Sequence, residues 1–169
     1  MADRLVEVQI EITHGEAQVK YEIAEGKLIV DRFLRSMPYP ANYGSVVGTI
    51  GGDGDPIDVF LITPAPLQPG CFIKVRAIGG IMSHDEGGED LKVIALPAKD
   101  MTSMYNNIKE LSDLAKTPWG QVFLENLEHF LKHYKDLETD RSVVSVGPWY
   151  SKEDVLKLID KARIAYMSC

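Results

Sequence analysis

The sequence is poor in cysteine and has no long apolar run, and each absence excludes a class of protein. Its two cysteines, Cys71 and Cys169, stand at the start of an expected strand and at the chain end, so we expect reduced thiols and no disulfide. No segment approaches the roughly eighteen apolar residues of a membrane span. Residues 1–5 hold no basic segment followed by an apolar stretch, so no signal peptide is expected. These features predict a cytoplasmic protein without a membrane partner.

The sequence also lacks an excess of positive charge. Its net charge of −7 argues against a protein that binds nucleic-acid phosphates broadly. Hydrophobic and charged contents of 45% and 25% are ordinary for a globular chain. With 169 residues, the chain suits one domain, residues 1–169, that buries roughly 70% of its unfolded surface.

Alternating hydrophobicity predicts strands over the first two-thirds of the chain. From Val6 to Ile12, apolar residues alternate strictly with glutamate and glutamine, which is typical of a half-buried strand. The same alternation covers 19–23. Further strands are expected between turn residues, at 28–33, 45–50, 57–63, 72–81 and 91–96. Many short antiparallel strands predict a small closed barrel.

Helical patterns occupy the last third of the chain. Thr117 can cap a helix that begins at Pro118 and carries an apolar stripe of Trp119, Phe123, Leu127, Phe130 and Tyr134. Ser151 and Asp154 resemble a capping box, with a shorter acid than usual. An apolar face follows at Val155, Leu158, Ile159 and Ala162. The chain is therefore expected to be an α+β protein.

Two acidic clusters are the most informative local feature. Three carboxylates lie within Asp53–Asp58, and a second cluster covers Asp85–Asp90. Such crowding raises carboxylate pKa values unless a cation neutralises the repulsion. The economical cation is a hard divalent metal, because Mg²⁺, Mn²⁺ and Ca²⁺ prefer oxygen ligands. The alternative is that aspartate and glycine simply form turns here, but two such clusters favour the metal.

Basic and phenolic residues are expected to share the acidic site. Asp90 and Lys92 have the same parity in one strand, as do Lys20 and Glu22 in another. Arg32 lies in a third strand, close in sequence to the tyrosine-rich segment 39–44. This mixture suits a polyanion chelated by metals, with cations binding the oxygens that the metals leave free. Ordinary surface ion pairing remains the alternative.

The order and spacing of these residues match a known family. The motif Asp-x-Asp-Pro-apolar-Asp is complete at 53–58. Five further blocks stand around it in family order, and together they cover roughly residues 10 to 165. They are Lys20-Tyr21-Glu22, Asp31-Arg32, Tyr39-Pro40-x-Asn42-Tyr43-Gly44, the segment 85–92 and the segment 133–138. The chain resembles the soluble, Mg²⁺-dependent inorganic pyrophosphatases of the bacterial type. The resemblance implies a distorted five-stranded OB-type barrel with flanking helices, and hydrolysis of pyrophosphate to two orthophosphates.

The resemblance also implies a role for each motif residue. Asp53, Asp58 and Asp90 would hold the principal metal, while Asp85, Glu22 and Glu11 would serve further ions. Asp55 would be the general base for a metal-bridging water, and Tyr39 a supporting hydrogen-bonding group. The residues expected to contact the phosphates are Lys20, Arg32, Tyr43, Lys92, Tyr134 and Lys135. Mg²⁺ is the expected cofactor, with Mn²⁺ or Zn²⁺ as substitutes. A homohexamer is expected by analogy, with the exposed side of the helix over 118–135 as a contact surface.

Four other interpretations compete. An EF-hand starting at Asp53 fails, because Ile57 and Pro64 occupy ligand positions. His129 and His133 have zinc-ligand spacing but lack the glutamate of the metalloprotease motif, so packing or a subunit interface is expected. An OB-type barrel could bind single-stranded nucleic acid, but the candidate face is acidic. A phosphohydrolase for nucleotides or longer polyphosphate remains open, although no glycine-rich phosphate loop is present.

Overall fold

The described part of the chain forms eight strands and three helices. The structure is a computed structural model that describes residues 3–35, 37–140 and 142–169. Its strands are β1 (Val6–Ile12), β2 (Val19–Ala24), β3 (Lys27–Phe33), β4 (Asn42–Val46), β5 (Asp58–Leu61), β6 (Phe72–Asp85), β7 (Gly88–Pro97) and β8 (Val143–Ser151). Its helices are α1 (Leu111–Ala115), α2 (Pro118–His133) and α3 (Lys152–Met167).

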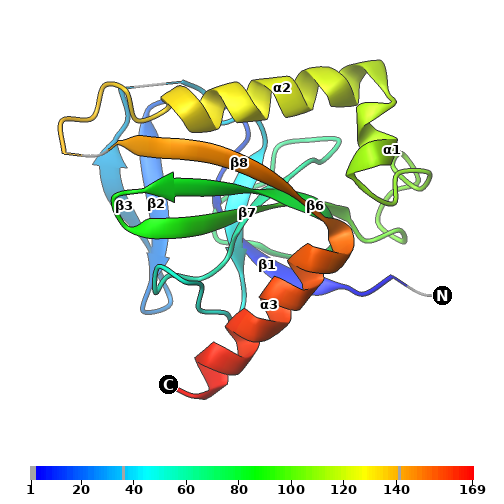
Figure 1. Cartoon of the computed structure of the whole chain (residues 1–169), viewed down its shortest axis with the longest axis horizontal. Helices are drawn as coiled ribbons and strands as arrows, with labels where there is room; N and C mark the ends of the chain where they lie inside the picture. Colours follow the sequence, from blue (N-terminus) through cyan, green and yellow to red (C-terminus); the bar gives the residue numbers. More distant parts are fainter. Residues whose placement is uncertain (1–2, 36, 141) are drawn as a thin grey trace.

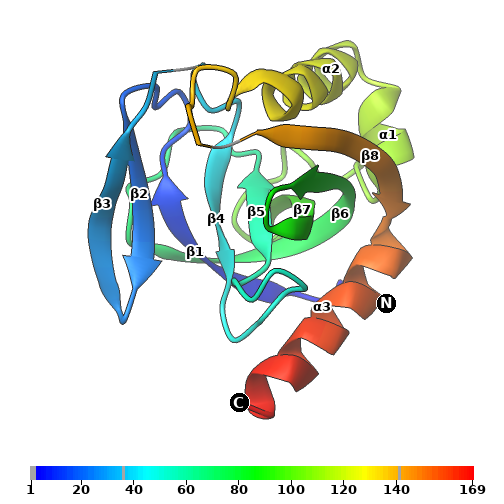
Figure 2. The ribbon, with the colours of Figure 1, turned by 60° about the vertical axis from the view of Figure 1, so that its left-hand side comes forward.

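Five strands close into a barrel. They neighbour one another in the order β1-β4-β5-β7-β6, and β6 pairs back with β1 to complete the ring (Figure 2). Only β5 and β7 run parallel; the other neighbours in the ring are antiparallel. The long strand β6 pairs with β1 near its start and with β8 near its end. This ring confirms the predicted α+β fold with a distorted five-stranded OB-type barrel.

The barrel strands separate two apolar cores. In β7, Leu91, Val93 and Ala95 belong to the inner core, which α3 extends with Val155, Ile159 and Ala162. Ile94 and Leu96 point the other way, into a second core shared with α2. Successive residues of β7 thus face different cores, and both faces of the strand are buried because α2 covers the outer one.

The two long helices begin where the sequence predicts. The Thr117 hydroxyl accepts the Gly120 N–H at 3.0 Å, and Pro118 is the first residue of α2. The Ser151 hydroxyl caps α3 by accepting the Asp154 N–H, and it donates to the Asp154 carboxylate at 2.9 Å. That carboxylate therefore bonds the cap side chain, and not the backbone as in a full capping box. Helix α2 crosses over the barrel, while α3 extends away from the end of β8 (Figure 1).

A separate hairpin stands beside the barrel. Strands β2 and β3 pair only with each other in their own two-stranded sheet (Figure 2). Most of β3 is exposed, and Phe33 at its end is 76% exposed. The hairpin contributes little to either core. Several of its side chains face the barrel instead.

The structure corrects several sequence expectations. The predicted strand at 45–50 ends at Val46, because a turn follows in which Gly48 adopts a φ of +72°. Strand β8 and the short helix α1 were not predicted, so the last third is not purely helical. Trp119, the first residue of the predicted stripe, is 45% exposed, whereas Leu127 and Phe130 are buried.

Cys71 and Cys169 are free thiols, as predicted. In the part of the chain that the structure describes, no helix combines the length and the apolar character needed to cross a membrane.

Candidate active site

One pocket gathers every residue that the sequence proposed for chemistry. It has a volume of about 360 Å³ and lies among the outer face of the barrel, the β2–β3 hairpin and the end of α2. The residues assigned by the motifs all line it: Glu11, Lys20, Glu22, Arg32, Tyr39, Tyr43, Asp53, Asp55, Asp58, Asp85, Asp90, Lys92, Tyr134 and Lys135. Residues more than a hundred positions apart in sequence therefore share one cavity.

Strand register builds the floor of the pocket. Ser45 in β4 pairs with Asp58 in β5, and Asp58 pairs with Lys92 in β7. Paired residues project to the same side of a sheet, so these three side chains form one row. The Ser45 hydroxyl donates to Glu11 at 3.1 Å, which extends the row to β1. At the neighbouring position Gly44 has no side chain, and a Cβ there would lie 2.1 Å from the Gln9 carbonyl oxygen of β1.

Lys92 is the centre of this floor. Its ammonium lies 2.5 Å from Asp58 Oδ2 and 2.6 Å from Asp90 Oδ2, and it donates to the Tyr43 hydroxyl at 3.2 Å. The side chain of Lys92 is only 4% exposed. The predicted shared facing of Asp90 and Lys92 is confirmed. Much of the repulsion between the acids is thus offset by a protein ammonium, whereas the sequence suggested a metal alone.

The buried acids differ from ordinary surface carboxylates. Burial, with the nearby Asp58 charge, raises the pKa of Glu11 to about 7. Burial also raises the pKa of Asp90 to about 7, although Lys92 opposes the shift, and burial raises the pKa of Asp53 above its usual range. Burial alone would lower the pKa of Lys92, but Asp58 and other neighbours raise it well above the usual value. The pocket therefore holds acids that favour a cationic partner, around an ammonium that stays charged.

The loop between β4 and β5 presents Asp53 and Asp55. Asp53 Oδ1 accepts the Asp55 backbone N–H at 3.0 Å, and the Gly51 N–H donates to the Asp55 carbonyl at 2.7 Å. Gly54 adopts a φ of +91° between them, a conformation that favours glycine. Asp55 is exposed, and its carboxylate has no hydrogen-bond partner among the residues the structure describes. That side chain is available to accept a proton.

The hairpin supplies two cations to the opposite wall. Lys20 and Arg32 are register partners in β2 and β3, and both contact Asp31, at 3.1 Å and 2.6 Å. Arg32 also contacts Glu138 beyond the end of α2, with its Nε 3.3 Å from Oε1. Glu22 lines the same pocket as Lys20, so the shared facing predicted for the two is confirmed.

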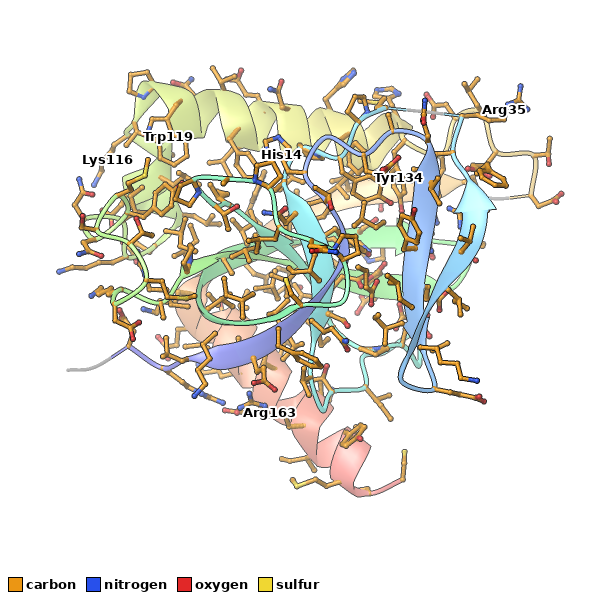
Figure 3. All side chains as sticks on the ribbon, turned by 180° about the vertical axis from the view of Figure 1, so that it is seen from behind. His14, Arg35, Lys116, Trp119, Tyr134 and Arg163 are labelled. Atoms are coloured by element: carbon orange, nitrogen blue, oxygen red, sulfur yellow. The ribbon has the colours of Figure 1, made fainter. Side chains whose placement is uncertain are left out.

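The end of α2 closes the remaining side. Tyr134 caps α2 and stacks on Phe130 with ring centroids 4.9 Å apart, at the end of the helix near the hairpin (Figure 3). Lys135 contacts Asp85 at 2.6 Å. Partial burial alone would raise the pKa of Asp85, but Lys135 and the Gly87 N–H hold it below its usual range. Tyr39 packs edge-on against Tyr43 and against Phe130, and burial raises its pKa.

The donor set fits a hard divalent cation in its chemistry. Asp53, Asp58 and Asp90 offer carboxylate oxygens in one cavity, and the ionised charges of Asp53 and Asp58 disfavour ionisation of Asp90. In their present positions, no three acidic, histidine or cysteine side chains of the described chain are close enough to hold a metal. The Oδ2 atoms of Asp58 and Asp90 contact Lys92, so a metal that uses those atoms competes with its ammonium.

No role was assigned from the sequence to three side chains that hold residues of the site in place. Asp31 and Glu138 fix Arg32, and Ser45 fixes Glu11. Asp31 had a signal, since it adjoins Arg32, and Ser45 shares strand parity with Tyr43. Apart from its motif block, nothing in the sequence pointed to Glu138, because its contact with Arg32 depends on how the segment after α2 packs.

The histidine pair lies outside the pocket. His129 and His133 are exposed on α2 with ring centroids 4.6 Å apart, and His133 Nδ1 lies 2.8 Å from Asp136 Oδ2. Neither side chain is buried, so the structure gives no support to the packing half of the expectation of packing or a subunit interface. Their exposure leaves an interface role untested.

Sequence comparisons find related proteins over nearly the whole chain. A family model described as inorganic pyrophosphatase matches residues 8–167. The inorganic pyrophosphatase of Agrobacterium fabrum is 42% identical over 160 residues, which cover 93% of this chain and 87% of that protein. That of Brucella melitensis is 41% identical over 165 residues, with coverages of 94% and 90%.

Solved structures resemble the chain over nearly its whole length. An inorganic pyrophosphatase from Coxiella burnetii superposes with a TM-score of 0.90 at 38% identity, covering 98% of this chain and 97% of that one. A crystal structure of an inorganic phosphatase from Anaplasma phagocytophilum gives a TM-score of 0.89 at 44% identity, with coverages of 96% and 94%.

Proposed function

Since this chain belongs to the inorganic pyrophosphatase family, we propose that it hydrolyses pyrophosphate in the pocket around Lys92, with Asp55 as general base. The chain is an inorganic diphosphatase, a hydrolase of phosphoric anhydrides. One observation carries the proposal: a single cavity combines many carboxylates with four cationic side chains, those of Lys20, Arg32, Lys92 and Lys135. Such a cavity suits a small polyanion that arrives with metal ions.

Substrate binding falls to the cationic and phenolic groups. We assign the phosphate oxygens to Lys20, Arg32, Tyr43, Lys92, Tyr134 and Lys135. Arg32 is held by Asp31 and Glu138, and Tyr134 by its stack on Phe130, so these groups are positioned before the substrate enters. Preorganised charge of this kind accounts for most of the catalysis of phosphoryl transfer, because positioning and electrostatics dominate that reaction.

Asp55 takes the proton of the attacking water. It is exposed in the pocket, its backbone is held by Asp53 and Gly51, and its carboxylate is not engaged by a cation of the described chain. By contrast, Asp58, Asp85 and Asp90 each contact a lysine. This contrast sets Asp55 apart from these three carboxylates and supports it as the base. A positioned base typically contributes about 10²–10⁴-fold.

Members of this family depend on metal ions, and we propose Mg²⁺ for this chain, with Mn²⁺ or Zn²⁺ as substitutes. Asp53, Asp58 and Asp90 would hold the principal ion, and Asp85, Glu22 and Glu11 would serve further ions. When bound, Mg²⁺ acidifies water and neutralises the oxygens of the leaving phosphate. Tyr39 packs behind this arrangement and supports it through Tyr43 and Phe130.

The decisive experiment compares three substrates. Orthophosphate release is measured from pyrophosphate, ATP and tripolyphosphate, with Mg²⁺, without it and after chelation. We expect release from pyrophosphate alone among the three, only with Mg²⁺. Preference for ATP or tripolyphosphate would favour a broader phosphohydrolase, and metal-independent release would remove the proposed mechanism. Binding of a single-stranded oligonucleotide without Mg²⁺ would revive the nucleic-acid alternative.

Two further properties are proposed with the function. We propose a homo-oligomer, a hexamer by family analogy, that uses the exposed side of α2, where Trp119 and Val122 are 45% and 54% exposed. Light scattering after size-exclusion chromatography tests it, and a monomer at micromolar concentration would contradict it. We also propose a cytoplasmic location, which the free thiols of Cys71 and Cys169 support.

A further inference from the structure

Lys92 is fully committed to its protein partners. An ammonium has three N–H groups. Three oxygens surround Lys92 Nζ: Asp58 Oδ2 at 2.5 Å, Asp90 Oδ2 at 2.6 Å and the Tyr43 hydroxyl at 3.2 Å. Because the side chain is only 4% exposed, water does not compete for these contacts. In this arrangement Lys92 has no donor left for a phosphate oxygen.

The two carboxylates are committed as well. Asp58 and Asp90 are both proposed ligands of the principal metal, and each directs an oxygen to the Lys92 ammonium. Their side chains are 19% and 15% exposed, so they too are largely shielded from solvent. A divalent cation bound between them would stand close to the ammonium, and the two positive charges would repel each other. Metal binding by Asp58 and Asp90 would therefore weaken their hold on the Lys92 ammonium.

We propose that Lys92 is the internal counter-ion of the metal site, and that the first divalent cation displaces its ammonium from Asp58 and Asp90. The displaced ammonium regains donors that can bind a phosphate oxygen. This inference rests on the proposed function and adds an order of events: the metal binds first, and its entry creates one of the phosphate contacts. It also explains why the metal ligands share a pocket without forming a metal-binding group in the described chain.

The other pocket cations do not meet these conditions. Lys20 contacts Asp31, which is no proposed metal ligand, and its side chain is 24% exposed. Lys135 contacts Asp85, which is proposed for a further ion and not for the principal one. Lys20 therefore offers a matched control: a pocket ammonium whose removal changes the local charge equally but releases neither Asp58 nor Asp90.

The test measures metal binding without substrate. Mg²⁺ affinity is determined by calorimetry for the full-length protein, for Lys92→Met and for Lys20→Met, at a pH of about 8 where free carboxylates are ionised. We expect Lys92→Met to bind its first Mg²⁺ about tenfold more tightly than the unaltered protein, a typical size for coupling between two sites. Lys20→Met should change the affinity much less. Equal or weaker binding by Lys92→Met, or an equal gain in Lys20→Met, overturns the proposal.

A second measurement uses the unaltered protein, so its result does not depend on whether a variant folds. Lysine ammonium NMR of the unaltered protein should show a protected Lys92 signal, which Lys92→Arg identifies by its loss. We expect Mg²⁺ to shift this signal and to speed its exchange with water, and an unchanged signal would overturn the proposal. Because neither readout uses pyrophosphate, an enzyme that hydrolyses pyrophosphate with an unmoved Lys92 would lose only this inference. Failure of the substrate panel would instead remove the proposed function.

Discussion

Strands β5 and β7 have an inner face and a pocket face, and the two faces differ in chemistry where the pocket lies. Val59, Leu61, Val93 and Ala95 point into the barrel and are 0% exposed. On the other face the same two strands carry Asp58 and Asp90, each in contact with Lys92. Successive residues of these two strands thus alternate between an apolar interior and a charged pocket.

The difference shows how the fold divides its tasks. Burial of the inner face stabilises the protein by roughly 25 cal/mol for each Å² of apolar surface. Burial of charges costs free energy unless each is well paired, so the pocket face adds little stability or lowers it. The apolar barrel interior therefore supplies the stability, and the pocket face supplies the groups that bind and react. Substitutions on the two faces should therefore have opposite effects on stability and on turnover.

Asp58→Ala should give the largest effect, because it breaks the pocket face at its centre. It removes a proposed metal ligand and one partner of Lys92. We expect loss of pyrophosphate hydrolysis at any practical Mg²⁺ concentration, with the barrel still folded. Orthophosphate release over a Mg²⁺ titration, with circular dichroism for the fold, checks this. Asp100→Asn, an exposed carboxylate away from the pocket, is the control, and recovery at high Mg²⁺ would contradict the expectation.

Asp55→Asn should separate the base from the metal ligands on that same face. The amide keeps the shape of the side chain but cannot accept the proton in the same way. We expect kcat to fall about 10²–10⁴-fold, while Mg²⁺ affinity stays unchanged. Steady-state kinetics and a calorimetric Mg²⁺ titration check the two halves. Normal turnover would remove Asp55 as the base.

Leu61→Ala tests the inner face. The side chain is 0% exposed, so its loss leaves a cavity that should cost about 2–5 kcal/mol of unfolding free energy. We expect kcat to remain close to that of the unaltered enzyme, because Leu61 points away from the pocket. Urea unfolding and kcat under folding conditions measure both. A collapse of kcat in a fully folded variant would show that the two faces are coupled.

Tyr39→Phe should give the smallest effect and sharpen the boundary between packing and chemistry. The ring keeps its contacts with Tyr43 and Phe130, at centroid distances of 5.4 Å and 4.9 Å, and loses only the hydroxyl. We expect stability within about 1 kcal/mol of the unaltered protein and a fall in kcat of at most about tenfold, the size of one hydrogen bond. An unchanged kcat would assign Tyr39 to packing alone.

Much of the fold was predictable, and the failures have physical causes. Strand β8 contains Gly147 and Pro148, residues that usually interrupt a strand. It lies at the edge of its sheet beside β6, and a proline is tolerated at an edge because it need not donate there. Helix α1 has five residues, too few for a period to be seen. The single domain over residues 1–169 stays a prediction.

The motif residues were predictable because acids crowded in sequence need a cationic partner, and the family pattern named the rest. The sequence by itself determined the alternation of β1, the caps at Thr117 and Ser151, and which residue types carry charge. Only the tertiary structure decided which cation each acid meets. The parallel register of β5 and β7 sets Lys92 beside Asp58, and the path after α2 brings Glu138 to Arg32. Such contacts depend on distances between strands and helices that are remote in sequence, which no local pattern encodes.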